Sequence, residues 1–145
     1  MKKDFIPYPQ NETFTSTINL IRMSKKELKD NSNELFEKAI SALKAVLSDL
    51  NHVQAIINAS MPNSNFESLT QNCLNRARVI IFQTDQGLLS VKEVSALNEE
   101  IRNLAELIIR EKANNPLFSN ELVTVISKTS KDAYLALELT EMTEK

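Results

Sequence analysis

The sequence predicts an all-α protein, and three features of its 145 residues lead to this prediction. Apolar residues recur in steps of three and four along most of the chain, which is the period of one helix face. Ser or Asn followed three residues later by Glu occurs at several sites, in the spacing of a helix capping box. Gly occurs once, whereas tight hairpins and phosphate-binding loops depend on several glycines. We therefore expect an antiparallel bundle of four to five amphipathic helices with coiled-coil-like packing.

Composition and charge exclude several classes of function. Seventeen Lys and Arg against nineteen Asp and Glu give a net charge of −2, without the basic excess of a nucleic-acid-binding protein. No apolar run has the length of a signal peptide or of a transmembrane segment. A single Cys cannot form an intramolecular disulfide, which fits a reducing compartment. We expect a cytoplasmic protein with no nucleic-acid partner and no transmembrane segment.

The chain is expected to divide into an extended arm, residues 1–12, and a single helical bundle domain, residues 13–145. Pro7 and Pro9 disfavour a helix in the arm. A helical period begins at Phe14, and Asn31 has capping-box spacing to Glu34. The pattern leaves open whether residues 13–60 form one helix or two.

The most regular apolar pattern lies between residues 36 and 57. Its members alternate in steps of four and three, as in a heptad seam, and Ala39, Val46 and Val53 widen the stripe. Gln54 is the one polar member, and such a residue can determine the register of paired helices; it could also simply lie at the edge of the stripe. We predict this set as the interaction seam of the protein: Phe36, Ile40, Leu43, Leu47, Leu50 and Ile57.

Further helices are expected beyond the turn at Pro62. Ser64 and Ser90 each precede a Glu by three residues, and a last helix is expected from about Ser119 to residue 141. Gly87 either ends the helix that starts at Ser64 or kinks a longer one that continues to residue 113. The expected inward-facing residues are Phe66, Leu69, Cys73, Ala77, Ile80, Val94, Leu97, Ile101, Leu104, Ile108, Leu122, Val125, Thr129, Ala133 and Ala136.

No catalytic, cofactor-binding or metal-binding residue is predicted. One His and one Cys cannot supply the four ligands of a zinc site, and no Glu-x-x-His motif of a ferritin-like site occurs. We expect His52 on or near a helix surface and Cys73 as a small buried apolar residue. Glu99 and Glu106 are expected on a solvated face with Arg102 and Arg110, at helical ion-pair spacing.

The segment from Phe36 to Leu107 resembles the phasins, bacterial proteins that coat polyhydroxyalkanoate storage granules. The similar features are the seam up to Ile57, the Pro/Asn/Ser interruption, Glu67-Ser68-Leu69, and an amphipathic stretch through Ser95-Ala96-Leu97. The chain departs from the phasin pattern in being poorer in Ala and Gln and richer in Asn and Ile. The resemblance implies a non-enzymatic, oligomeric, granule-associated protein, and it carries over no site residue.

A second class of function fits the same amphipathic helices. A protein-binding module, such as a secretion chaperone, an immunity protein or a phage-derived inhibitor, would use a helical face on a protein partner. Continuous apolar stripes favour self-association in both cases, because they must be buried against something. The sequence does not separate a granule surface from a protein partner.

Overall fold

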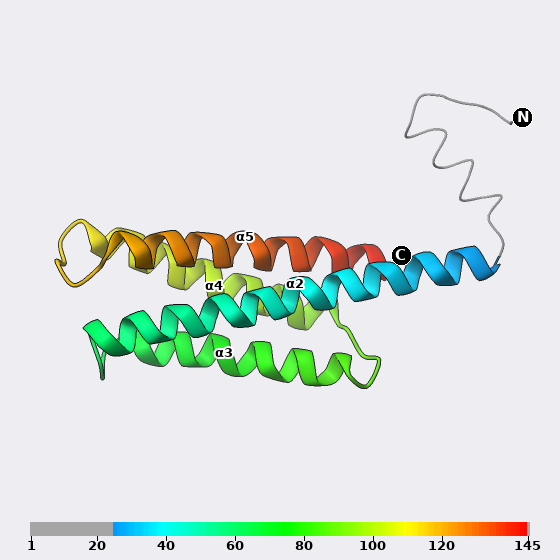
Figure 1. Ribbon diagram of the computed structural model, residues 1–145, viewed down its shortest axis with the longest axis horizontal. Helices are drawn as coiled ribbons and strands as arrows, with labels where there is room; N and C mark the ends of the chain where they lie inside the picture. Colours follow the sequence, from blue (N-terminus) through cyan, green and yellow to red (C-terminus); the bar gives the residue numbers. More distant parts are fainter. Residues whose placement is uncertain (1–24, 145) are drawn as a thin grey trace, which may run out of the picture. The chain divides into compact units, whose positions relative to one another are not determined.

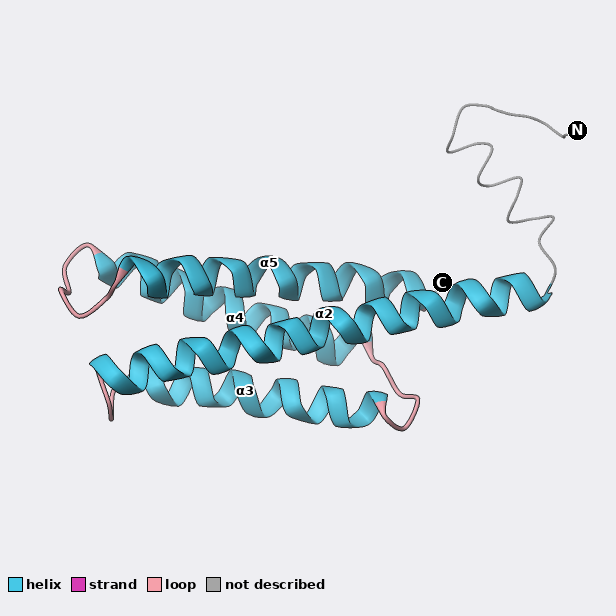
Figure 2. Ribbon diagram, in the orientation of Figure 1, coloured by secondary structure: helices cyan, strands magenta, loops and turns pink. Residues whose placement is uncertain are grey.

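Four helices make up most of the computed structural model, which describes residues 25–144, with side chains from residue 33 onward (Figures 1 and 2). They are α2 (Lys25–Ser60), α3 (Asn65–Thr84), α4 (Val91–Lys112) and α5 (Asn120–Thr143). No strand occurs within the described residues, so the all-α prediction is confirmed. The chain divides into two compact units, residues 1–34 and 35–145, and the second is the subject below. The arm expected over residues 1–12 lies outside the described residues.

Helix α2 is a single helix where the sequence allowed a break. It runs without interruption from Lys25 to Ser60, so Asn31 does not start a new helix. Asn and Ser cost only tenths of a kcal/mol in a helix interior, and the Lys, Glu and Leu residues on both sides favour the helix. Residues 13–24, which the longer alternative also included, lie outside the described residues.

The turn between α2 and α3 has one of the two hydrogen bonds of the expected capping box, and the Glu67 carboxylate binds one residue before the expected position. Ser64 is the N-cap of α3, and its side chain accepts a hydrogen bond from the Glu67 backbone N–H at 3.4 Å. The Glu67 carboxylate in turn accepts from the backbone N–H of Asn63 at 3.0 Å. The predicted end of α2 before Pro62 and the predicted start of α3 are therefore confirmed.

Gly87 ends α3 and does not kink a longer helix. Its φ of +79° lies in the left-handed region, and its N–H donates to the Thr84 carbonyl at 3.0 Å. The N–H of Leu88 donates to the Gln83 carbonyl at 3.0 Å. These two bonds form a Schellman motif, which satisfies carbonyls at the helix end and favours Gly at the left-handed position. Of the two alternatives, the break is the one observed.

The last two helices also begin at serine caps. Ser90 accepts from the Glu93 N–H at 3.4 Å, and Ser119 accepts from the Leu122 N–H at 3.1 Å. Helix α4 ends at Lys112, just before the Asn-Asn-Pro sequence, because proline disfavours helix at the preceding residue.

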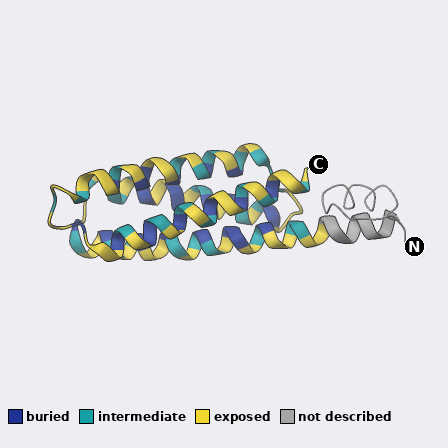
Figure 3. Cartoon of the chain, turned by 90° about the horizontal axis from the view of Figure 1, so that it is seen from above, coloured by how far each residue is buried: buried dark blue, intermediate teal, exposed yellow. Residues whose placement is uncertain are grey.

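One apolar cluster draws residues from all four helices (Figure 3). Every predicted inward-facing residue of α4 is buried, from Val94 to Ile108. The inner face of α5 is lined by smaller residues, including Thr129, whose hydroxyl donates to the carbonyl one turn earlier. Phe118, in the loop before α5, is also buried and closes this cluster against Phe66.

Candidate functional site

Charged residues are distributed unequally over the outer faces of the helices. Of the exposed residues of α3, only Arg78 is charged; the others are Asn65, Ser68, Gln71, Asn72, Asn75, Val79 and Phe82. On α4 most exposed residues are charged, namely Lys92, Glu99, Arg102, Glu106, Arg110 and Glu111, beside Ser95, Asn103 and Ile109. An exposed helix face normally carries charged side chains, and depletion of charge marks the centre of protein interfaces. The outer face of α3 is therefore the candidate functional site.

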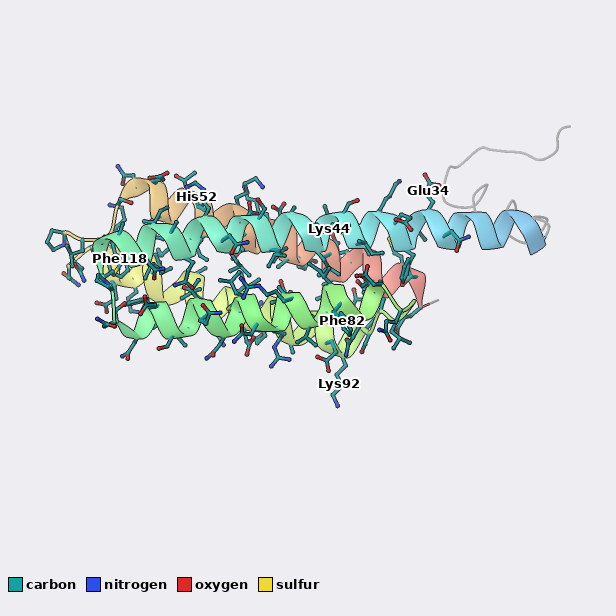
Figure 4. All side chains as sticks on the ribbon, turned by 60° about the horizontal axis from the view of Figure 1, so that its bottom comes forward. Glu34, Lys44, His52, Phe82, Lys92 and Phe118 are labelled. Atoms are coloured by element: carbon teal, nitrogen blue, oxygen red, sulfur yellow. The ribbon has the colours of Figure 1, made fainter. Side chains whose placement is uncertain are left out.

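Five residues, four exposed and one half-buried, form a continuous line along this side of α3, which we call the α3 outer stripe. They follow one another in steps of four, four, three and four, so they lie on one side of the helix. The stripe begins with a carboxylate, passes through two amides and a guanidinium, and ends with an aromatic ring that is 64% exposed. Its members are Glu67, Gln71, Asn75, Arg78 and Phe82. Figure 4 shows Phe82 near the end of α3 that leads to α4.

Hydrogen bonds within the stripe leave specific groups free. Gln71 Nε2 donates to Asn75 Oδ1 at 3.0 Å, which leaves the Gln71 oxygen as an acceptor and the Asn75 nitrogen as a donor. The guanidinium of Arg78 has no ion-pair partner within the described residues, although Glu67 lies on the same stripe. The stripe thus presents one free charge and a free donor–acceptor pair.

An open groove of about 390 Å³ lies between the stripe and helix α2. Its lining is made of amides, a hydroxyl and one carboxylate: Gln54, Asn58, Glu67, Ser68, Gln71 and Asn72. Gln54 Nε2 donates to Asn58 Oδ1 at 2.8 Å, while the buried Gln54 Oε1 has no partner in the part of the chain described. Gln54 is partly buried, so it lies at the border of the apolar stripe of α2.

The residues predicted as the interaction seam do not all lie in one environment. Leu43, Leu50 and Ile57 are fully buried in the core of the chain, and Leu47 packs partly against it. Phe36 and Ile40 are half-buried. The residues expected to flank the seam, Ala39, Val46 and Val53, are completely buried. The buried face of α2 therefore includes the predicted flanking residues and half of the predicted seam, and the other half of the seam lies at its border.

His52 and Cys73 lie in different environments, one at the surface and one in the core. The imidazole of His52 is half exposed and lies 3.0 Å from the Glu121 carboxylate. Cys73 is 2% exposed, and burial, with a smaller effect of the negative charge of Glu100, raises the pKa of its thiol to about 12. A thiol with such a pKa is not ionised near neutral pH and is a poor nucleophile.

Ion pairs between helices are the contacts that sequence analysis did not predict. Arg76 on α3 donates to the Glu100 carboxylate on α4 at 2.8 Å and lies 3.5 Å from Glu93. The Glu100 hydrogen bond raises the pKa of Arg76 further above its ordinary value. On the predicted solvated face of α4, Glu99 pairs with Arg102 at 2.6 Å, whereas Glu106 and Arg110 form no ion pair in the described part of the chain.

A second cluster joins α2 to α5. Lys128 donates to Asp49 at 3.2 Å and to Asp132 at 2.8 Å. Burial and the facing Asp132 carboxyl raise the pKa of Asp49 to about 6, against the opposing effect of Lys128. Burial also raises the pKa of Asp132, but hydrogen bonds with Asp49 and Lys128 outweigh it and lower that pKa overall. The sequence signal was Lys128 four residues before Asp132, a helical pair spacing, whereas the contact with Asp49 spans 79 residues.

Asp49 should make the stability of the protein fall as the pH rises from about 4 to 6. Its raised pKa means that the folded protein holds a proton that the unfolded chain has released, and stability decreases with pH in that interval. In Asp49→Asn we expect the free energy of unfolding to fall by about 1–2 kcal/mol less over this interval than in wild type. Urea unfolding at pH 4, 5, 6 and 7 measures the difference. Glu138→Gln, on the exposed face of α5, is the matched control and should keep the wild-type profile. An Asp49→Asn profile parallel to wild type would contradict the assignment.

Among the side chains that the structure describes, residues 33–144, no group of three or more His, Cys, Asp and Glu could hold a metal ion. No described helix has an apolar stretch long enough to cross a membrane. Comparison with known protein families, curated proteins and solved structures finds no match to the chain. The site must therefore be interpreted from its own geometry.

Proposed function

We propose that this chain is a non-enzymatic interaction protein that binds another protein molecule through the α3 outer stripe. The observation that carries the proposal is the contrast between the charge-poor outer face of α3 and the heavily charged outer face of α4. Amide and apolar groups can be desolvated in a contact at lower cost than charged groups can. A secretion chaperone, an immunity protein or a phage-derived inhibitor would use such a face.

The absence of catalysis is part of the proposal. It is supported by the buried, protonated thiol of Cys73. Asp49 on α2 and Asp132 on α5 share Lys128 as a partner, and this cluster joins the two helices. These environments favour a structural part for Cys73, Asp49 and Asp132.

The proposal includes an antiparallel bundle with coiled-coil-like packing as the scaffold for the stripe. It is supported by the buried residues of α2, which alternate in steps of four and three from residue 39 to residue 57: Ala39, Leu43, Val46, Leu50, Val53 and Ile57. It is also supported by the ion pairs that join α2 to α5 and α3 to α4. A rigid scaffold holds the stripe in one geometry before binding.

Granule coating, the function implied by the phasin resemblance, is the alternative. Exposed apolar residues near the α3–α4 turn favour it, because Phe82 is 64% and Leu88 60% exposed. Against it, the long apolar stripes lie in the core, so contact with a polyester surface through them would require the helices to separate. A fluorescent fusion in polyester-producing cells distinguishes the two: granule rings support coating, and diffuse cytoplasmic signal supports a protein partner.

A photo-crosslinking experiment tests the proposed function directly. A benzophenone amino acid is placed at Asn75 in the middle of the stripe, and in a control protein at Ser95 on the exposed face of α4. We expect a discrete protein adduct on irradiation from position 75 and none from position 95. Absence of an adduct from position 75, in a protein whose helix content is unchanged, would overturn the proposal.

A further inference from the structure

The α3 outer stripe is complementary to itself when a second copy of the helix runs in the opposite direction. Its negative charge, Glu67, lies near the helix start, and its free positive charge, Arg78, lies eleven positions later on the same side. In an antiparallel pair of identical helices, Glu67 of each copy would face Arg78 of the other copy. Two opposite-charge pairs would form, one at each end of the contact.

The amides of the stripe lead to the same register independently. Because Gln71 already donates to Asn75 within the chain, the free groups are the Gln71 oxygen and the Asn75 nitrogen. An antiparallel second copy would place its Asn75 nitrogen opposite the Gln71 oxygen of the first copy, and its Gln71 oxygen opposite the Asn75 nitrogen of the first copy. The midpoint of Gln71 and Asn75 is residue 73, and the midpoint of Glu67 and Arg78 falls between residues 72 and 73. The ion pairs and the amide contacts are therefore related by nearly the same two-fold axis.

The exposed aromatic residue fits this register as well. About a two-fold axis at residue 73, Phe82 of each copy lies over the turn before α3 of the other copy. That turn presents Pro62 and Asn63, both of which are exposed. The pairing would cover a ring that is 64% exposed in the single chain. Such a contact, made by the same residues on both subunits, is the usual geometry of a homodimer.

We infer that two copies of this chain form a dimer through antiparallel pairing of their α3 outer stripes, with Arg78 of each copy bound to Glu67 of the other. The inference rests on the proposed function and names the partner as a second copy. Charge complementarity and the shared register favour this partner over an unrelated protein. The outer face of α4, with its dense charges, stays in contact with solvent.

Charge exchange tests the pairing. The full chain is examined by sedimentation velocity between 1 and 200 µM as wild type, as Arg78→Glu, and as the double variant Glu67→Arg with Arg78→Glu. We expect wild type to approach twice the chain mass of 16.4 kDa. Arg78→Glu should raise the dissociation constant at least tenfold, because it places two pairs of carboxylates together, and the double variant should restore it to within about threefold. Restoration by the exchange is an outcome that a purely structural role of either residue would not produce.

The controls separate this inference from the proposed function. The exchange of Glu99 and Arg102, an ion pair on the exposed face of α4, should leave dimerisation unchanged. Circular dichroism melting of each variant checks folding, since Glu67 also accepts from the Asn63 N–H. A concentration-independent mass of 16.4 kDa, or a dimer insensitive to Arg78→Glu, overturns the inference. A crosslinked adduct from position 75 with a different protein, together with a monomeric mass, overturns the inference while the proposed function stands.

Discussion

Leu43→Asp should unfold the protein at room temperature. Leu43 is fully buried within the apolar cluster formed by all four helices. Its replacement removes the apolar contacts of a Leu and leaves a carboxyl group that has no water around it. We expect a loss of more than about 4 kcal/mol, a large part of the roughly 5–15 kcal/mol by which small domains are stable. Circular dichroism at 222 nm and urea titration measure this loss.

Two other substitutions by Asp in α2 serve as comparisons for Leu43→Asp. Leu47→Asp places the charge at a partly buried position, where the side chain can turn toward water, and we expect a loss about half as large. Ser48→Asp introduces the same group at an exposed position and should change stability by less than about 0.5 kcal/mol. Equal stability of Leu43→Asp and Ser48→Asp would show that α2 does not contribute this face to the core.

Helix ends were the most predictable part of the fold, because they depend on interactions within a few residues. Ser64 and Ser90 are helix caps in the structure, as their spacing predicted, and Ser119 caps the last helix where its start was expected. Gly87 has the left-handed backbone conformation of a helix end. Each of these signals reflects hydrogen bonds between neighbours in sequence. The capping-box spacing at Asn31 misled for the same reason, because nothing local distinguishes an interior Asn from a capping one.

The candidate site was less predictable than the fold. Periodicity placed Leu43 and Leu50 on an apolar face but could not decide which border residues would be buried, since that depends on where the other helices lie. The pairing of Arg76 with Glu100 and of Asp49 with Lys128 likewise depends on distances between helices. The low charge of the α3 outer face was visible in the sequence as a helix with few charged residues. Its meaning depends on knowing which of those residues are exposed.

Phe118→Ala should be the second most destabilising of the changes considered. Phe118 is 3% exposed although it lies in a loop, and its ring packs edge-on against Phe66 with centroids 4.9 Å apart and an interplanar angle of 83°. Removal of a buried Phe costs about 3–5 kcal/mol. The adjacent Leu117 is 51% exposed, so Leu117→Ala is a matched control that should change the free energy of unfolding by less than about 0.5 kcal/mol.

A double-mutant cycle on the two rings identifies the source of this loss. If the edge-to-face contact itself stabilises the fold, Phe66→Ala and Phe118→Ala together should cost about 0.5–1.5 kcal/mol less than the sum of the single changes, measured by urea unfolding. A loop that packs its aromatic residue against the start of α3 ties the α4–α5 connection to the helix that carries the candidate site. Exactly additive losses would mean that each ring is stabilised by the core alone, and the loop would then have no direct influence on the position of α3.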